Sequence, residues 1–170
     1  MTVKIIGAVL ILAACGSFGL IIAYHHKWEV GTLKKLIGAL DFLECELQYR
    51  MSALPDLCRQ TASESDGIIR QVFMRLANEL EDQISPDVRR CMQSVLAKTK
   101  DVPTVTVECL QLLGDSLGRF DLQGQLKGLQ NVRQTCRGKL NKLMGNAEVR
   151  LRSYQTLGLC AGAAIVILLI

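Results

Sequence analysis

Few side chains in this sequence have the types and spacing that enzyme chemistry needs. The two histidines, His25 and His26, are adjacent, and neighbouring helix residues point apart, so they make a poor metal-binding pair. Nucleophilic catalysis requires a cysteine or serine beside a base, and the rest of the chain has no histidine to act as one. We therefore expect no catalytic residue, no metal site and no cofactor.

Two other patterns contain polar or glycine residues that are candidates for chemistry. Glu44 and Glu46 are a possible carboxylate pair, but residues two apart on a helix do not face each other. The segment from Gly114 to Gly118 lacks both the spacing and the lysine of a phosphate-binding loop. Both patterns fit helix packing or partner contacts better than catalysis, so we expect neither an enzyme nor a small-molecule substrate.

The cysteines show no metal-binding pattern. Of the seven, none forms a CxxC or CxxH pair, which makes a structural zinc site improbable. Five lie scattered through the middle of the chain and are expected to be free thiols acting as small core residues: Cys45, Cys58, Cys91, Cys109 and Cys136. Free thiols of this number favour a reducing compartment.

Long apolar segments lie near both ends of the chain. Residues 5–24 contain no charge, and twenty residues match the roughly 20 that a helix needs to cross a bilayer core of about 30 Å. Residues 154–170 are shorter but span if Tyr154 lies at one interface. We expect two transmembrane helices around a domain at residues 25–153, with Gly158 and Gly162 available for close helix packing.

Basic residues beside these segments predict which side the domain occupies. Lys27, Lys34 and Lys35 follow the first segment, and Arg150 and Arg152 precede the second, so the positive-inside rule predicts a cytoplasmic domain. A competing hypothesis is a lipoprotein or signal-anchored helical module outside the membrane, because Leu12-Ala13-Ala14-Cys15 fits a lipidation signal. The apolar run continues past Cys15, which argues against that alternative.

The middle of the chain has helical periodicity throughout. Apolar residues recur at spacings of three and four in the stripes Leu33–Leu47, Ile69–Leu80 and Val88–Leu96, and again from Leu126 to Leu151. Asp66 and Ser85-Pro86-Asp87 are predicted helix starts, and Gly118 is a predicted stop. With a short helix at about 53–61 and another at about 104–117, these predict an all-α, antiparallel six-helix bundle whose last helix continues into the second span.

Charge is unevenly distributed along the domain. Residues 36–118 have a net charge of −5, and residues 119–155 have a net charge of +6. We expect the basic part to lie toward anionic lipid headgroups and the acidic part to face a soluble partner. The basic residues lack interleaved aromatics, so a nucleic-acid partner is not expected.

Across its whole length the sequence resembles the stage III sporulation protein AB family. The resemblance rests on several motifs: Lys4-Ile-Ile-Gly-Ala-Val-Leu10, Leu43-Glu44-Cys-Glu46-Leu47-Gln-Tyr49, Leu54-Pro55, Leu113-Gly114-Asp-Ser-Leu117-Gly118-Arg-Phe-Asp121 with Gln123 and Gln125, and Leu157-Gly158-Leu-Cys-Ala-Gly162. Ala53-Leu54-Pro55 departs from the family, where a proline before the leucine is expected, and this bears on how the second helix begins.

The resemblance implies a function that no motif shows by itself. Family members are similar to the platform protein of type II secretion and type IV pilus machines. The implied role is a non-enzymatic subunit of a channel complex in the mother-cell membrane around the forespore, required for sporulation. It would couple a cytoplasmic secretion-type ATPase to other membrane subunits. Its implied partner or structural positions are Glu44, Glu46, Tyr49, Gly114, Gly118 and Asp121.

Overall fold

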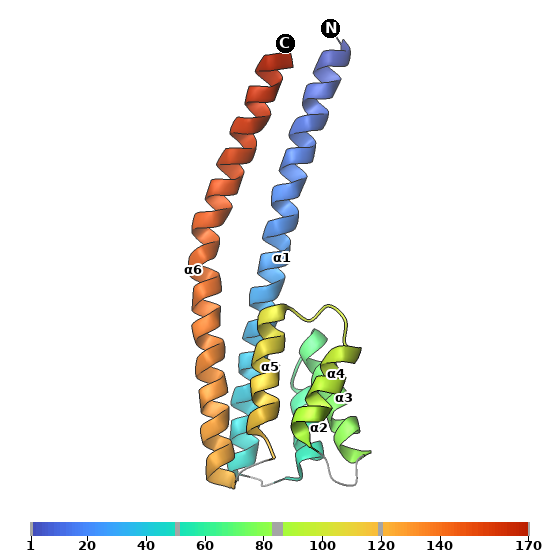
Figure 1. Ribbon diagram of the computed structural model, residues 1–170, viewed down its shortest axis with the longest axis vertical. Helices are drawn as coiled ribbons and strands as arrows, with labels where there is room; N and C mark the ends of the chain where they lie inside the picture. The colour runs from blue at the N-terminus through green and yellow to red at the C-terminus, as the bar shows by residue number, and fades with distance from the viewer. Residues whose placement is uncertain (1, 50–51, 83–86, 119–120, 170) are drawn as a thin grey trace. The chain divides into compact units, whose positions relative to one another are not determined.

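All the regular structure that can be described in this protein is helical. The computed structural model describes the backbone of residues 2–49, 52–82, 87–118 and 121–169, and the side chains of residues 24–49, 52–82, 87–118 and 121–145. In chain order the helices are α1 (Thr2–Tyr49), α2 (Leu54–Ser63), α3 (Gly67–Glu81), α4 (Val88–Lys98), α5 (Thr104–Ser116) and α6 (Leu122–Leu169) (Figure 1). The all-helical prediction is confirmed over these ranges, which contain no strand.

The first and last helices are much longer than the others. Each has 48 residues, a length of about 72 Å at 1.5 Å per residue. The sequence predicted a separate apolar helix before the first helix of the domain, but α1 runs unbroken through both regions. The predicted continuation of the last helix is confirmed, because α6 extends from Leu122 to Leu169. The six helices therefore include both end segments.

The chain divides into two compact units. One consists of Met1–Trp28 with Lys142–Ile170, and the other of Glu29–Asn141. The second unit contains α2 to α5 with the adjoining parts of α1 and α6. Its side chains form the core and all the polar contacts described below.

Among the described residues, no helix has a stretch both long and apolar enough to cross a membrane. The predicted spans at residues 5–24 and 154–170 lie outside the residues whose side chains are described, Tyr24 excepted, and so do Cys15, Gly158 and Gly162.

The apolar core is built from the predicted stripes. On α1 every member of the Leu33–Leu47 stripe is buried, because spacings of three and four place these side chains on one helix face. On α3 the predicted stripe is also buried, and Phe73 is among the largest side chains with no exposed surface. α2 packs against α3, α3 against α4, and α4 against α5. The predicted core of this unit is confirmed for both stripes.

The helix starts are less well predicted than the core. α4 begins at Val88, where Asp87 is the N-cap and its Oδ1 accepts a hydrogen bond of 3.1 Å from Arg89 N. The predicted start, with Ser85 as the cap and Pro86 as the first helical residue, is therefore two residues too early, and Ser85 and Pro86 lie outside the described ranges. An aspartate caps as well as a serine, so both candidates satisfied the same rule.

Two other starts agree with the sequence more closely. Asp66 occupies the N-cap position of α3 as predicted, although its side chain forms no capping bond. In α2, Pro55 lies in the first turn, where a backbone N–H has no helical partner to lose. Ala53, at the position before the leucine where the family pattern has a proline, is the N-cap residue, so the helix begins at Leu54 without that proline.

Candidate functional site

A cluster of polar side chains joins α1 to α6. It consists of Asp41 and Glu44 from α1 with Gln130, Arg133 and Arg137 from α6, and is called here the α1–α6 polar cluster. Arg133 NH1 lies 2.8 Å from Asp41 Oδ1 and 2.6 Å from Glu44 Oε2. Gln130 Nε2 donates to Glu44 Oε1 at 2.8 Å, and Arg137 NH2 lies 3.7 Å from Asp41 Oδ2.

Helix geometry explains why these residues meet. Asp41 and Glu44 are three residues apart, as are Gln130 and Arg133, and this spacing places each pair on one helix face. The side chains of Glu44 and Arg133 are only 15% and 28% exposed. Removing one partner from such a partly buried group leaves the other without its compensating charge, which costs more than an exposed ion pair contributes.

The three predicted residues near the end of α1 do not form one cluster: Glu44, Glu46 and Tyr49 differ in position and exposure. Glu44 belongs to the α1–α6 polar cluster, whereas Glu46, two positions further, lies on a different face and is half-buried. Tyr49 is 78% exposed at the end of α1. In this structure Glu44 makes contacts between two helices, whereas Tyr49 is exposed.

The predicted glycines serve close packing between α4 and α5. A Cβ at Gly114 would lie 3.0 Å from Met92 Cβ, and one at Gly118 would lie 2.7 Å from Val88 Cγ2. Gly118 also has a φ of +74°, a conformation that favours glycine and ends the helix. Asp121 Oδ1 accepts a hydrogen bond of 3.0 Å from Gly124 N and caps α6.

The contacts between α5 and α6 do not follow from any local pattern in the sequence. Gly128 brings α6 close to α5, because a Cβ there would lie 2.8 Å from Ser116 Cβ. Lys139 Nζ pairs with Glu108 Oε2, and this contact raises the pKa of Lys139. Cys109, next to Glu108, and Cys136, one turn before Lys139, are both fully buried. The only signal in the sequence was the apolar periodicity of α6, which placed Cys136 on the inner face.

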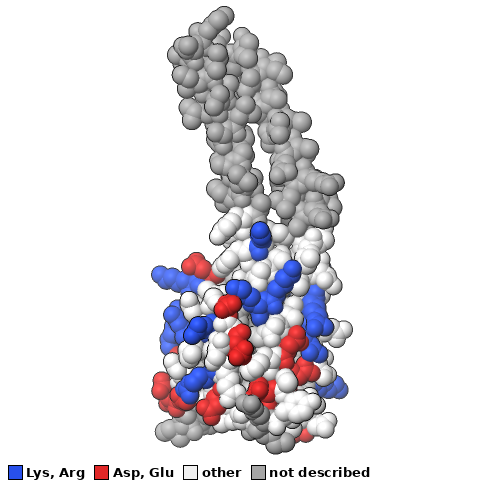
Figure 2. Space-filling view, turned by 180° about the vertical axis from the view of Figure 1, so that it is seen from behind, with Lys and Arg blue, Asp and Glu red and all other residues white. Residues whose placement is uncertain are grey.

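Ion pairs join the basic segment of the chain to the acidic one, so the uneven charge along the sequence does not give two separate charged surfaces. Three of the basic residues in the +6 segment are paired with acidic residues of α1 or α5: Arg133, Arg137 and Lys139. Lysine, arginine and acidic side chains are interleaved over the described part of the face in Figure 2. On this face, the expected separation into a basic and an acidic side is not present, because folding brings the oppositely charged segments together.

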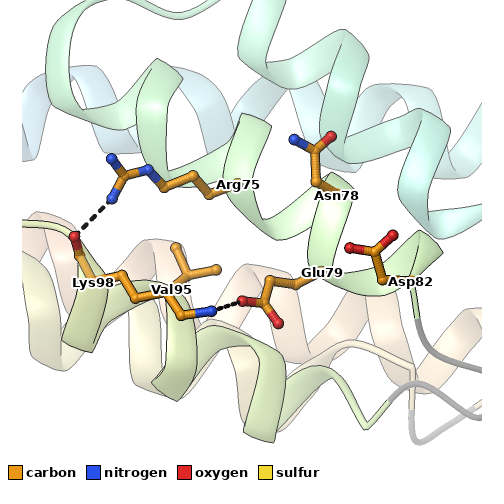
Figure 3. Close-up of a pocket in the computed structure, with 6 residues that line it drawn as sticks. All are labelled: Arg75, Asn78, Glu79, Asp82, Val95 and Lys98. Atoms are coloured by element: carbon orange, nitrogen blue, oxygen red, sulfur yellow. Dashed lines mark hydrogen bonds and ion pairs between the residues drawn. The ribbon is translucent and has the colours of Figure 1, made fainter.

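A groove of about 380 Å³ lies between α3 and α4 (Figure 3). Arg75 NH1 donates to Lys98 O at 2.8 Å and to Thr99 Oγ1 at 3.1 Å, which satisfies the end of α4. Lys98 Nζ and Ser94 Oγ both donate to Glu79 Oε1, and these contacts lower the pKa of Glu79. The charges lining the groove therefore mostly serve to join α3 to α4.

The described side chains provide little for catalysis. Within them, no group of three His, Cys, Asp or Glu side chains is arranged to hold a metal ion. Burial raises the pKa of the Cys58 thiol to about 12, so it is protonated and unreactive at neutral pH. Cys45 is exposed on α1, and its predicted place in the core is therefore wrong.

Comparison with known proteins identifies the family. A family model described as stage III sporulation protein AB matches residues 4–170. The chain belongs to the stage III sporulation protein AB family. One solved structure, titled stage III sporulation protein AB, has 18% sequence identity and a TM-score of 0.61, with 71% of this chain and 97% of that chain covered. No curated protein matches.

Within this family, the described geometry fits a structural part better than a reaction centre. Membership supports a sporulation-related scaffold subunit. At the low identity of the solved relative, the structural match establishes the fold alone. The roles of the α1–α6 polar cluster and of the α4–α5 glycine contacts are therefore assigned from this structure alone, and none is taken from the relative.

Proposed function

We propose that this chain is a non-enzymatic platform subunit of a sporulation channel complex, in the mother-cell membrane around the forespore. It couples a cytoplasmic secretion-type ATPase and other membrane subunits to one helical domain. The proposal is supported by family membership together with the two 48-residue helices, each of which continues from an apolar end segment into the domain. Residues 5–24 and 154–170 are its membrane anchors, and residues 25–153 its cytoplasmic part.

The α1–α6 polar cluster gives this proposal a physical basis. A platform must carry force between a soluble motor and membrane segments without its helices sliding. Arg133 holds Asp41 and Glu44 on the neighbouring helix at 2.8 and 2.6 Å. A partly buried charge-assisted contact of this kind fixes the register of two helices, because any shift along the axis separates the charges.

The acidic turn between α2 and α3 is the proposed contact for the ATPase. Glu64 and Asp66 are exposed there. In contrast, Glu81 at the other end of α3 is paired with Arg59 at 2.6 Å. Exposed carboxylates of this kind attract a basic partner surface and mainly affect the rate and specificity of association.

A binding measurement tests the coupling to the ATPase. The full-length chain in detergent is immobilised, and binding of the purified ATPase from the same complex is followed. The variant with Glu64→Gln and Asp66→Asn is expected to bind about tenfold more weakly, with a slower association rate. Asp101→Asn, which removes one exposed carboxylate in the α4–α5 loop, is the control for loss of negative charge elsewhere on the surface. If the folded wild-type chain does not bind the ATPase, the proposed coupling is contradicted.

Accessibility of Cys45 tests the position of the domain. Cys45 is exposed, whereas Cys136 is fully buried and cannot report on sidedness. A membrane-impermeant maleimide is expected to label Cys45 only after the cells are opened. Labelling in intact cells supports instead the lipoprotein or signal-anchored module outside the membrane. Membrane retention of a Cys15→Ser variant then separates lipid attachment from a spanning helix.

A further inference from the structure

Exposed apolar side chains are concentrated in a short part of the first compact unit, the unit that contains both end segments. The side chains described in this unit are those of residues 24–28 and 142–145. Tyr24 is 76% exposed and Met144 is 47% exposed, so this short part has two of the four large hydrophobic side chains that are exposed in the described part of the chain. Exposed apolar side chains that are grouped and rimmed by polar residues are typical of a membrane or partner surface.

The aromatic residues of this part lie on one side of α1. Tyr24 and Trp28 are four residues apart, a spacing that places them on the same helix face. The ring of His25 contacts Trp28 edge-on, with centroids 5.8 Å apart and an interplanar angle of 69°. From Tyr24 to Trp28 the helix rises about 6 Å, similar to the roughly 5–8 Å of headgroup layer on each side of a bilayer core. Tyrosine and tryptophan are enriched at this level because each combines an apolar ring with a polar atom.

The only charged residues of this part are lysines. Lys27 and Lys142 are exposed, and residues 24–28 and 142–145 contain no aspartate or glutamate. Glu29 follows directly, but it is half-buried and belongs to the other unit, and residues two apart on a helix do not face each other. Exposed cations of this kind are attracted to an anionic surface.

We propose that Tyr24, Lys27 and Trp28 of α1, with Lys142 and Met144 of α6, form a belt that binds the headgroups of anionic phospholipids, called here the interfacial belt. The aromatic rings lie among the headgroups, and the ammonium groups contact lipid phosphates while the lysine stems lie along apolar surface.

The interfacial belt rests on the membrane location proposed above and adds a lipid class to it. Residues 5–23 precede Tyr24 on the same helix and contain no charge, so the belt lies where an apolar segment of α1 meets the polar domain. Rings and charges at this position fix the depth of a long helix, because a shift along its axis removes them from the headgroup layer.

Trp28 reports on the belt directly, because it is the single tryptophan of the chain. The full-length chain is reconstituted in nanodiscs with equal amounts of phosphatidylcholine and phosphatidylglycerol, and one of the two lipids carries bromine on its acyl chains near the headgroup. Bromine quenches tryptophan fluorescence only at close range. Brominated phosphatidylglycerol is expected to quench at least about twofold more than brominated phosphatidylcholine, because lysines near the surface favour anionic lipid. Salt at about 1 M should remove the difference, since it shortens the Debye length to about 3 Å.

Two pairs of substitutions assign the lipid preference to the belt. Lys27→Gln with Lys142→Gln should bring the ratio of quenching toward one. Lys100→Gln with Lys127→Gln removes the same charge from two exposed lysines of the other unit and should leave the ratio unchanged. All four side chains are exposed, so the circular dichroism spectra of both variants should match that of the wild type.

The belt is overturned if the two lipids quench the wild type equally, if neither quenches it, or if the variant at Lys27 and Lys142 keeps the full preference. Resistance to carbonate extraction tests the proposed membrane anchors separately. A chain that resists extraction but is quenched equally by both lipids has anchors and no belt. A chain that carbonate removes but that keeps the lipid preference has the belt and contradicts the anchors.

Discussion

The part of the domain formed by α2 to α5 and the segment of α6 beside it are stabilised in different ways. The short helices bury large apolar side chains such as Phe73, Met92 and Leu110, each without exposed surface. The described part of α6 has only three buried apolar side chains and is joined to its neighbours by Arg133, Lys139 and Gln130. Apolar burial therefore holds the first region, and specific polar contacts position the second.

This difference indicates which part of the domain can change its conformation. Apolar packing is non-directional and collapses cooperatively, whereas a charge-assisted contact holds only at one register and weakens with salt. We expect α6 to be the part that loosens first, at a free energy below that of global unfolding.

The largest effect is expected from removing the apolar core of the first region. Phe73→Ala should lower the free energy of unfolding by about 3–5 kcal/mol, through lost burial and the cavity left behind. Denaturant unfolding followed by circular dichroism measures it. Tyr49→Ala, at a side chain that is 78% exposed, is the control and should change stability by less than about 0.5 kcal/mol. Equal effects of the two variants would show that Phe73 is not in the core.

A smaller effect is expected at the glycine that ends α5. Gly118→Ala should cost about 2–3 kcal/mol, because alanine is strained at a φ of +74° and its Cβ would lie 2.7 Å from Val88 Cγ2. Gly138→Ala is the matched control: this helical glycine has no atom within 4 Å of a Cβ, so the change should stabilise by about 0.5–1 kcal/mol. Thermal unfolding of both variants checks the opposite signs.

The α1–α6 polar cluster is the next target. Arg133→Met keeps the length of the side chain but leaves Asp41 and Glu44 without their shared cation, at an expected cost of about 1–2 kcal/mol. Hydrogen exchange should become faster in residues 122–141 of α6 and remain unchanged in α3. Lys127→Met, at an exposed residue of the same helix, should show neither change. Uniformly faster exchange in both helices would remove the distinction between the two regions.

The smallest effect concerns the ion pair within the first region. The contacts from Lys98 and Ser94 lower the pKa of Glu79, so they stabilise the fold above the ordinary glutamate pKa of 4.5, and that stabilisation is lost as pH falls through the lowered value. Stability in acid should therefore fall less steeply for Glu79→Gln than for the wild type. Ser94→Ala removes one contact and should remove only part of the pH dependence. Parallel pH curves for wild type and Glu79→Gln would contradict this assignment.

A structural feature could be predicted when the residues that form it are close together in the sequence. The stripes on α1 and α3 and the stop at Gly118 are local patterns of propensity and periodicity, so they were predicted correctly. The start of α4 was missed by two residues because Ser85 and Asp87 are both good caps. The contact of Arg133 with Asp41 joins residues 92 positions apart, and no local pattern specifies it.

The sequence by itself determined the helical class, the apolar faces, the apolar end segments and the absence of any recognisable catalytic motif. These properties follow from periodicity and composition, which act over a few turns of helix. Only the tertiary structure decided that Glu44 anchors α6, that Gly128 admits Ser116, and that Lys139 pairs with Glu108. Such pairs depend on how whole helices pack, because the side chains come from distant parts of the chain and meet only when the core has formed.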